Sequence, residues 1–293
     1  MSSLFDRVVE RVPVRTGLGL AQTIRLLNPV ALARGLWTQR ELIFQLTKRD
    51  ILGRYRGSYL GLAWSFLTPL LMLTIFTLVF GVIFQARWGL ENESRFHFAL
   101  VLFCGLIVFN LFSECVTRSP GLVLSQPQYV KKIRFPLEVL PVIVFLSAAA
   151  HAAASLLILL LGLWLGVGIF HWTVIWFPLV MLPLAALCLG LSWWLASMGV
   201  YFRDIGQIIG VATMAVLFLS PIFYPVSSIP EWLRPFYELN PLALIIGNAR
   251  ATLIWGQPPN WFHLLAGMTA NFVVALLGYA WFQRTRRGFA DVL

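Results

Sequence analysis

The chain has 293 residues, of which 59% are hydrophobic and only 12% carry a charged side chain. Soluble domains are only about 45 to 50% apolar, so this composition excludes a water-soluble fold and indicates an integral membrane protein. The formal net charge of +10 comes from basic residues beside the apolar runs, where anionic headgroups and the positive-inside rule account for them without a nucleic-acid partner.

Residues 1–60 are the most polar part of the chain. Asn28 is an N-cap candidate before Pro29, and this pair predicts a helix that continues to about Arg54. Most of its apolar side chains share one broad side, which predicts an amphipathic helix in the membrane interface; the alternative is a solvated helix packed on a partner. The apolar side holds Leu36, Trp37, Ile43, Phe44, Leu46 and Ile51, the polar side holds Glu41, Gln45, Lys48 and Arg49, and Arg40 and Thr47 depart from the pattern.

Six apolar segments follow, each near the length that crosses a hydrocarbon core of about 30 Å. They cover residues 61–85, 98–118, 138–166, 173–200, 205–225 and 261–283. Lys and Arg number 18 on the side that holds both termini and 4 on the other side, so both termini are expected in the cytoplasm. The sequence thus predicts an all-α membrane protein with a cytoplasmic segment 1–60, a six-span domain 61–284 and a cytoplasmic tail 285–293.

The segment 226–260 is neither a simple loop nor a span. Its apolar part, residues 242–255, is too short to cross the membrane and contains Asn248 and Arg250. Prolines recur at positions 221, 225, 230, 235 and 241, and each one removes a backbone donor and disfavours helix at the preceding residue. We therefore expect short helices here that re-enter the membrane or lie at its surface.

The sequence has no motif for catalysis or nucleotide binding. It contains no HExxH, no GxSxG and no GxxxxGK[ST], so we predict no catalytic residue, no metal site, no cofactor and no ATP bound through a P-loop. Cys104, Cys115 and Cys188 lie in apolar runs without the spacing of metal ligands. No apolar h-region directly follows the N-terminal charges, so we expect no cleavable signal peptide.

Three ionisable residues within the predicted spans are candidates for a functional role. Glu114 and Arg118 are four residues apart on one helix face, which predicts an intrahelical ion pair or, alternatively, a polar lining for a hydrophilic cargo. His151 lies deep in the third span, where it either hydrogen-bonds within the packed helices or borders a translocation path.

Aromatic residues within or near the ends of spans could line a channel, because ring faces hold sugars through weakly directional contacts that permit sliding. Core packing is the alternative for each of them. The channel-lining candidates are Phe109, Phe112, Glu114, Trp193, Trp194, Phe218, Phe223 and Tyr224.

Four segments closely resemble the permease subunits of bacterial ATP-binding-cassette exporters for surface polysaccharides, the group of the O-antigen, teichoic-acid and capsule exporters. They are LTKRDILGRYRGSYLGLAWSFLTPL (46–70), QPQYVKKIRFPLEVLP (126–141), YFRDI (201–205) and SPIFYPVSSIPEWLRPFYELNPLALII (220–246). One departure is Leu137, where many members of that group have a charged residue after the proline.

This resemblance implies a multi-pass permease of the bacterial inner membrane. Two copies would pair with two separate ATPase subunits, which hold the ATP and Mg. The complex would contact membrane lipids and export a polysaccharide carried on undecaprenyl pyrophosphate. It also implies an interface helix over 29–54, a cytoplasmic coupling helix between spans two and three, and periplasmic re-entrant helices over 229–255.

Site residues follow from the same resemblance. Cationic groups at the cytoplasmic mouth would suit the lipid diphosphate, since oxyanions prefer charge-assisted partners. The candidates for this contact are Lys48, Arg54 and Arg56, and those for coupling to the ATPase are Gln126, Tyr129, Lys131, Lys132, Arg134, Arg203 and Asp204.

Two alternatives remain open at this stage. An exporter of the same architecture could move a drug or a lipid, which would require a narrower and less aromatic path. An integral-membrane transferase acting on lipid-linked sugars would require a cluster of carboxylates or histidines at one membrane face, and the sequence shows none.

Overall fold

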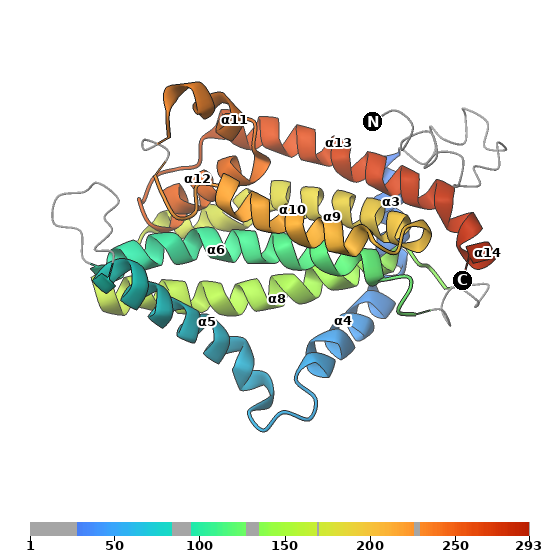
Figure 1. Ribbon diagram of the computed structural model, residues 1–293, viewed down its shortest axis with the longest axis horizontal. Coiled ribbons are helices and arrows are strands. Elements are labelled where there is room, and N and C mark those ends of the chain that lie inside the picture. The colour runs from blue at the N-terminus through green and yellow to red at the C-terminus, as the bar shows by residue number, and fades with distance from the viewer. Residues whose placement is uncertain (1–27, 84–94, 127–134, 169, 226–228, 293) are drawn as a thin grey trace.

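The computed structural model describes residues 28–83, 95–126, 135–168, 170–225 and 229–292, and every regular element within them is a helix (Figure 1). Four long helices, α6, α8, α9 and α13, run roughly side by side, while α4 and α5 diverge as a V (Figure 1). The α-helices are α3 (Pro29–Thr38), α4 (Arg40–Arg54), α5 (Trp64–Phe76), α6 (Arg95–Arg118), α8 (Val139–Gly162), α9 (Phe177–Tyr201), α10 (Ile205–Leu219), α11 (Arg234–Glu238), α12 (Pro241–Leu253), α13 (Trp261–Thr285) and α14 (Phe289–Val292).

Five helical segments are long and apolar enough to cross a membrane, and they coincide with five of the six predicted spans. The first of them continues from α5 into a π-helical segment, Thr77–Ile83, and the third continues from α8 into another, Leu163–Val167. The five segments are Gly61–Phe80, Phe96–Gly121, Val139–Val167, Trp172–Tyr201 and Trp261–Val292. The described residues therefore form an all-helical membrane protein.

The fifth predicted segment, 205–225, is helical only over α10. A helix of these 15 residues is roughly 22 Å long, shorter than the hydrocarbon core of about 30 Å. It ends because Ser220, which precedes Pro221, takes an extended conformation with φ −98° and ψ 144°. The prediction of a continuous 21-residue helix is wrong here, and six crossings remain a prediction.

The predicted N-terminal helix is two helices rather than one. It starts as expected, because the Asn28 side chain accepts a hydrogen bond from the backbone N–H of Val30 at 2.9 Å. It breaks at Gln39, which has φ −95° and ψ 10°. Near the break, the Thr38 hydroxyl donates to the Arg34 carbonyl at 2.9 Å, a bond that competes with the helical ladder and often bends helices.

Helix α4 divides its apolar residues between two faces, which corrects the single apolar side predicted from the sequence. Ile43 and Thr47 are buried on the side that contacts α8, whereas Phe44 is 66% exposed. Thr47, which departs from the amphipathic pattern, thus belongs to the packed face. The exposed Phe44, with Trp37 of α3, provides the apolar surface that an interfacial helix needs.

Helix α6 lies at the centre of the core and α5 at its edge. In the most apolar 18-residue stretch of Phe96–Gly121, 83% of the residues are buried, compared with 6% in Gly61–Phe80.

Helices α9 and α13 approach most closely at two glycines. A Cβ atom on Gly190 would lie 2.7 Å from the Val274 carbonyl oxygen, and one on Gly278 would overlap the Gly190 backbone. Small residues let these two backbones touch.

Between residues 229 and 255 the chain forms the short helical pieces predicted from its prolines. They are a 3-10 turn at Glu231–Leu233, then α11 and α12. The Asn240 side chain caps α12 by accepting from the Leu242 N–H at 3.0 Å. Helix α12 packs against α6, α9 and α13, so α12 is part of the core, whereas Trp232 and Leu239 before it are exposed.

Candidate functional site

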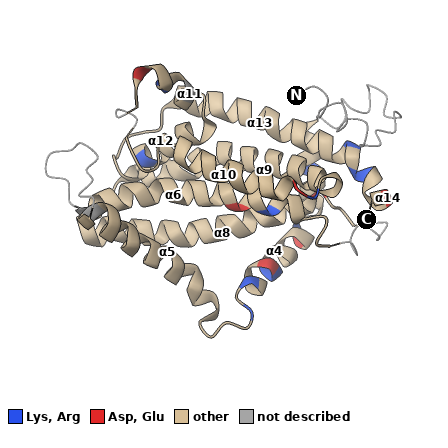
Figure 2. Cartoon of the chain, viewed as in Figure 1, with Lys and Arg blue, Asp and Glu red and all other residues tan. Residues whose placement is uncertain are grey.

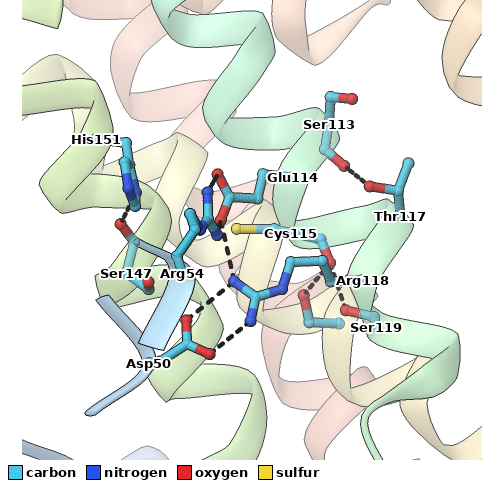
Figure 3. Close-up of polar contacts among 11 residues, drawn as sticks. Asp50, Arg54, Ser113, Glu114, Cys115, Thr117, Arg118, Ser119, Ser147 and His151 are labelled. Carbon is cyan, nitrogen blue, oxygen red and sulfur yellow. Dashed lines mark hydrogen bonds and ion pairs between the residues drawn. The ribbon is translucent and has the colours of Figure 1, made fainter. Parts of the chain in front are cut away.

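Four charged side chains from α4 and α6 form one ion-pair network. Charged residues gather on α4 and at the adjacent end of α6, whereas the long helices are otherwise mostly uncharged (Figure 2). Arg118 contacts Asp50 at 2.7 Å (Nη2 to Oδ1) and Glu114 at 3.1 Å (Nη1 to Oε1). Arg54 donates to both carboxylate oxygens of Glu114, with Nη1 lying 3.3 Å from Oε2 (Figure 3).

The network follows from an acid-to-base spacing of four residues that occurs on both α4 and α6. On α4 an acid precedes a base by four residues (Asp50, Arg54), and α6 repeats this order (Glu114, Arg118). Residues four apart share a helix face, so each helix presents one acid and one base to the other. The charges balance, and the side chains are only 20% to 34% exposed. Partial burial strengthens these pairs beyond ordinary surface pairs.

The network also affects the titration of Asp50. Burial by itself raises the pKa of this carboxyl, but hydrogen bonds and charge from Arg118, with a further contribution from the charge of Arg54, outweigh burial. The pKa of Asp50 is therefore lowered below its usual value of 3.8. Asp50 stays ionised through the physiological pH range.

Two cavities border the network. The first, which we call the Arg49 pocket, has a volume of about 430 Å³ and lies between α4, the end of α6 and the start of α8. Its residues are Leu46, Arg49, Asp50, Arg118, Gly121, Leu122, Ser125, Gln126, Leu140, Ile143 and Val144.

The second cavity, which we call the His151 cleft, has a volume of about 480 Å³ and lies between α5, α6 and α8, next to the end of α4. Its polar residues are Arg54, Tyr55, Trp64, Ser65, Thr68, Asn110, Glu114, His151 and Ser155.

His151 is partly hydrogen-bonded within the packed helices. Its Nδ1 lies 2.7 Å from the Ser147 carbonyl oxygen, which can only accept, so Nδ1 carries the proton and a neutral ring leaves Nε2 as an acceptor. This Nε2 is buried and has no hydrogen-bond partner among the residues that the structure describes. Helix packing, one of the two interpretations from the sequence, thus accounts for one ring nitrogen only.

The cationic residues predicted to contact a lipid diphosphate are not equivalent. Lys48 and Arg56 are exposed, whereas Arg54 is held by Glu114. The predicted Glu114–Arg118 pair is confirmed, but it is half of a larger network. Asp50 was not among the predicted site residues, and the repeated acid-to-base spacing of four residues was the signal that could have found it.

The residues predicted to contact an ATPase are described only in part. Arg203 and Asp204 lie in an exposed turn between α9 and α10, and Gln126 is half-buried at the rim of the Arg49 pocket. Tyr129, Lys131, Lys132 and Arg134 lie outside the described residues.

The predicted channel-lining aromatics fall into two groups. Trp193 is 1% exposed, and its ring packs edge-on against the ring of Tyr279. Its Nε1 donates to the Glu138 carbonyl at 3.0 Å, so within this chain it is a core residue. Phe109 and Phe112 are also buried. The remaining candidates reach the surface at least partly: Trp194 and Phe218 are exposed, and Phe223 and Tyr224 are half-buried.

Phe223 joins an aromatic cluster at the end of the bundle opposite the network. Its ring stacks on Phe80 at 5.7 Å and on Phe218 at 6.0 Å between centroids. The next residue, Tyr224, donates to the Phe218 carbonyl at 2.6 Å and contacts the Tyr237 hydroxyl at 2.6 Å. Phe80, near the end of the first span, was not predicted to take part.

A second buried charge lies near this aromatic cluster. Arg250 of α12 is 5% exposed, and three backbone carbonyls accept from it. They belong to Val101 at 3.1 Å, Pro221 at 2.6 Å and Ile222 at 2.9 Å. Arg250 therefore ties α12 to α6 and to the turn after α10, where Pro221 leaves carbonyls outside the helical ladder.

Comparison with known proteins gives consistent matches. The family description "ABC-2 type transporter" matches residues 41–254. The chain is 31% identical over 265 residues to the O-antigen export system permease protein RfbA of Myxococcus xanthus, covering 89% of this chain and 99% of that protein. It is 24% identical over 254 residues to RfbA of Klebsiella pneumoniae (86% and 95%) and 23% identical over 241 residues to the polysialic acid transport protein KpsM of Escherichia coli (82% and 89%).

Proposed function

The chain belongs to the ABC-2 type transporter family, and we propose that it is the channel-forming subunit of an ATP-driven exporter that moves a lipid-linked polysaccharide out of the cytoplasm. The observation that carries this proposal is its similarity to export permeases over nearly their whole length, 99% for the Myxococcus protein. The relatives are named for O-antigen and for polysialic acid, so surface glycans are the shared class of cargo.

The working unit is two copies of this chain with two ATPase subunits. The sequence has no P-loop, so the energy source must be a separate protein. One face of α10 supports pairing with a second copy, because its apolar side chains are among the most exposed of the chain. These are Ile208, Val211, Met214 and Phe218, with exposures of 65%, 74%, 61% and 60%.

Force reaches the bundle through its cytoplasmic end. We assign coupling to the ATPase to Lys131, Lys132 and Arg134, and the exposed turn at Arg203 and Asp204 is a second contact with it. Helix α4 receives the movement through its contacts with α6 and α8. ATP-driven closure of the motor thus displaces helices at the end of the bundle that holds the ion-pair network.

The cargo interacts with two chemically different regions. Lys48 and Arg56 are exposed cations near the network and suit the diphosphate of the carrier lipid. At the opposite end, Phe218 presents an exposed ring within the aromatic cluster, and such faces bind sugars without fixing them in place. Both termini lie in the cytoplasm, and the chain is a multi-pass protein of the bacterial inner membrane.

The test is reconstitution of the purified chain with its partner ATPase. We expect a lipid-linked glycan to stimulate ATP hydrolysis, and replacement of Lys131, Lys132 and Arg134 by alanine to abolish export while the protein still inserts. A matched control replaces the exposed Arg284 and Arg287, which should leave the response to ATP intact. Unchanged export by the triple variant, or ATP hydrolysis by the purified chain alone, would contradict the proposal.

A further inference from the structure

One aromatic side chain fastens the last described helix to the bundle. Helix α14 has only four residues, too few for a helix that is stable by itself. Its Phe289 is fully buried and packs edge-on against the rings of Phe282 and Tyr201, at 5.5 and 6.0 Å between centroids. The same hydrophobic cluster includes Ile43 of α4, so it lies at the end of the bundle that holds the ion-pair network. Burial of Phe289 thus fixes the position of residues 285–292, which we call the C-terminal turn.

Two hydrogen bonds also attach the C-terminal turn to α9. Thr285 and Ser197 are both buried, and their hydroxyl oxygens are 2.7 Å apart. One helical turn further along α9, the Tyr201 hydroxyl donates to the Thr285 carbonyl at 3.1 Å. Closer to the middle of the bundle, the backbones of α9 and α13 already touch at Gly190 and Gly278. The C-terminal turn and the last turns of α9 therefore form one packed unit.

This unit holds Glu138, the residue before α8, at two points. The Glu138 carbonyl accepts from Nε1 of Trp193 on α9 at 3.0 Å. The Glu138 carboxylate contacts Arg286 of the C-terminal turn at 2.7 Å (Oε2 to Nη1), across 148 positions in the sequence. The two side chains are 21% and 39% exposed, and ion pairs this accessible to water add little to stability. The second contact instead supplies orientation, because a residue held at two points cannot pivot about the first.

The start of the connection from α6 to α8 also rests on α9. The Ser119 hydroxyl donates to the Cys115 carbonyl at 2.5 Å, which continues α6 into the connection. The next residue, Pro120, lies directly on Gly199 of α9, where a Cβ atom would overlap the Pro120 carbonyl group. Glycine is the residue that permits so close an approach of two backbones. Both described ends of the connection are therefore held by the same end of α9.

The residues assigned to coupling, 131–134, lie four to seven positions before Glu138. A push on them moves the bundle only if the end of the connection does not yield. We propose that Arg286 is a positioning residue for coupling: through Glu138 it fixes the end of the α6–α8 connection against α9. When this ion pair is lost, part of the motor's stroke turns the connection about its remaining bond to Trp193. The inference rests on the proposed function for the motor, but the position of Glu138 is tested without an ATPase.

The first measurement reports whether Arg286 holds the end of the connection. Leu137 is buried beside Glu138, so Leu137→Cys in the purified protein is treated with a water-soluble maleimide. The three native cysteines are buried and stay in place, and the chain without the new cysteine gives the background. Adding R286Q should speed labelling of position 137 about three- to fivefold, as loss of a partly exposed ion pair predicts.

Two control variants accompany R286Q. E138R/R286E restores the pair with its charges reversed, and R287Q removes the same charge from the exposed neighbouring residue. Both should label within about 1.5-fold of the parent, because the end of the connection stays held. Equal labelling of the parent and R286Q, or an exchanged variant that labels as fast as R286Q, would overturn the position assigned to Glu138.

The second measurement is glycan export per ATP hydrolysed, in proteoliposomes that contain the chain and its partner ATPase. R286Q should lower this ratio at least about twofold, and E138R/R286E should restore it. Damage to the fold would instead reduce export and hydrolysis together and leave the ratio constant. Faster labelling of R286Q with an unchanged ratio would overturn the link to coupling. A parent that gives the expected labelling but exports no glycan would count against the proposed function alone.

Discussion

The two ends of the bundle hold buried charge in opposite ways. At the α4–α6 end, two arginines and two carboxylates satisfy one another and remain partly exposed. At the other end, Arg250 is almost fully buried and bonds to backbone carbonyls of α6 and the turn after α10. Carboxylates on side chains can exchange partners, whereas carbonyls belong to the main chain and cannot move without it. The first end is thus suited to movement and the second to a fixed framework.

The largest expected effect comes from breaking the fixed end. Arg250→Met leaves three carbonyls without a donor in an interior that water does not reach, and should lower the free energy of unfolding by about 3–5 kcal/mol. Thermal unfolding of the purified protein in detergent, together with the yield of inserted protein, measures this loss.

The matched control is Arg284→Met, which removes the same charge from an exposed position in the last turn of α13. It should change stability by less than about 0.5 kcal/mol. Similar losses for the two variants would show that Arg250 contributes as a charge rather than as a donor to the backbone.

The α4–α6 end should show smaller effects that depend on the partner. Arg118→Ala should cost about 1–2 kcal/mol, because it leaves Asp50 without its bidentate partner in a half-buried position. In the variant D50A/R118A the two losses should not add, and a double-mutant cycle should give a coupling of about 1 kcal/mol. Purely additive losses would mean that these two residues do not act as a pair.

The Tyr224 hydroxyl, at the same end of the bundle as Arg250, should make a smaller contribution to stability. Tyr224→Phe removes both the donor to the Phe218 carbonyl and the contact with Tyr237, and should cost about 1 kcal/mol. Tyr237→Phe removes only the second contact and should cost less. If the order were reversed in thermal unfolding, the bond to the main chain would not be the one that holds the end of α10.

The smallest effect is a pH dependence confined to the α4–α6 end. Since the pKa of Asp50 is lowered in the folded protein, its contribution to stability is complete above about 3.8 and is lost as the pH falls through the lower folded value. Stability measured from pH 5 down to pH 3 should fall less steeply in Asp50→Asn than in the parent, and Arg250→Lys should keep the parental slope. An unchanged slope in Asp50→Asn would contradict the role of this carboxylate.

Local rules read along the chain predicted much of the fold. Apolar length located five spans, Asn28 and Pro29 located a helix start, and the prolines after residue 220 located the short pieces. The predictions failed at two helix ends, where a helix-breaking residue outweighed the apolar pattern around it. Pro221 ended α10 early, and the back-bonded Thr38 lies at the break in the N-terminal helix.

Only the contacts within one helix of the candidate site could be predicted from the sequence. The Glu114–Arg118 pair follows from helical spacing and was expected, but its link to Asp50 joins residues 68 positions apart. For Arg250, hydropathy indicated an unusual polar residue in an apolar segment and could not indicate that main-chain carbonyls satisfy it. Trp193 and Phe109 were equally compatible with a channel wall or a core until their burial was known.

By itself the sequence determined that this chain is a helical membrane protein of a transporter family without its own ATP-binding motif. These properties depend on composition, local periodicity and short motifs, which need no knowledge of neighbours in space. Only the tertiary structure decided which charges meet, which aromatics are buried and where cavities form beside the charges. Those features depend on contacts between distant segments, and the free energy of a buried charge or ring is set by the partners that packing places beside it.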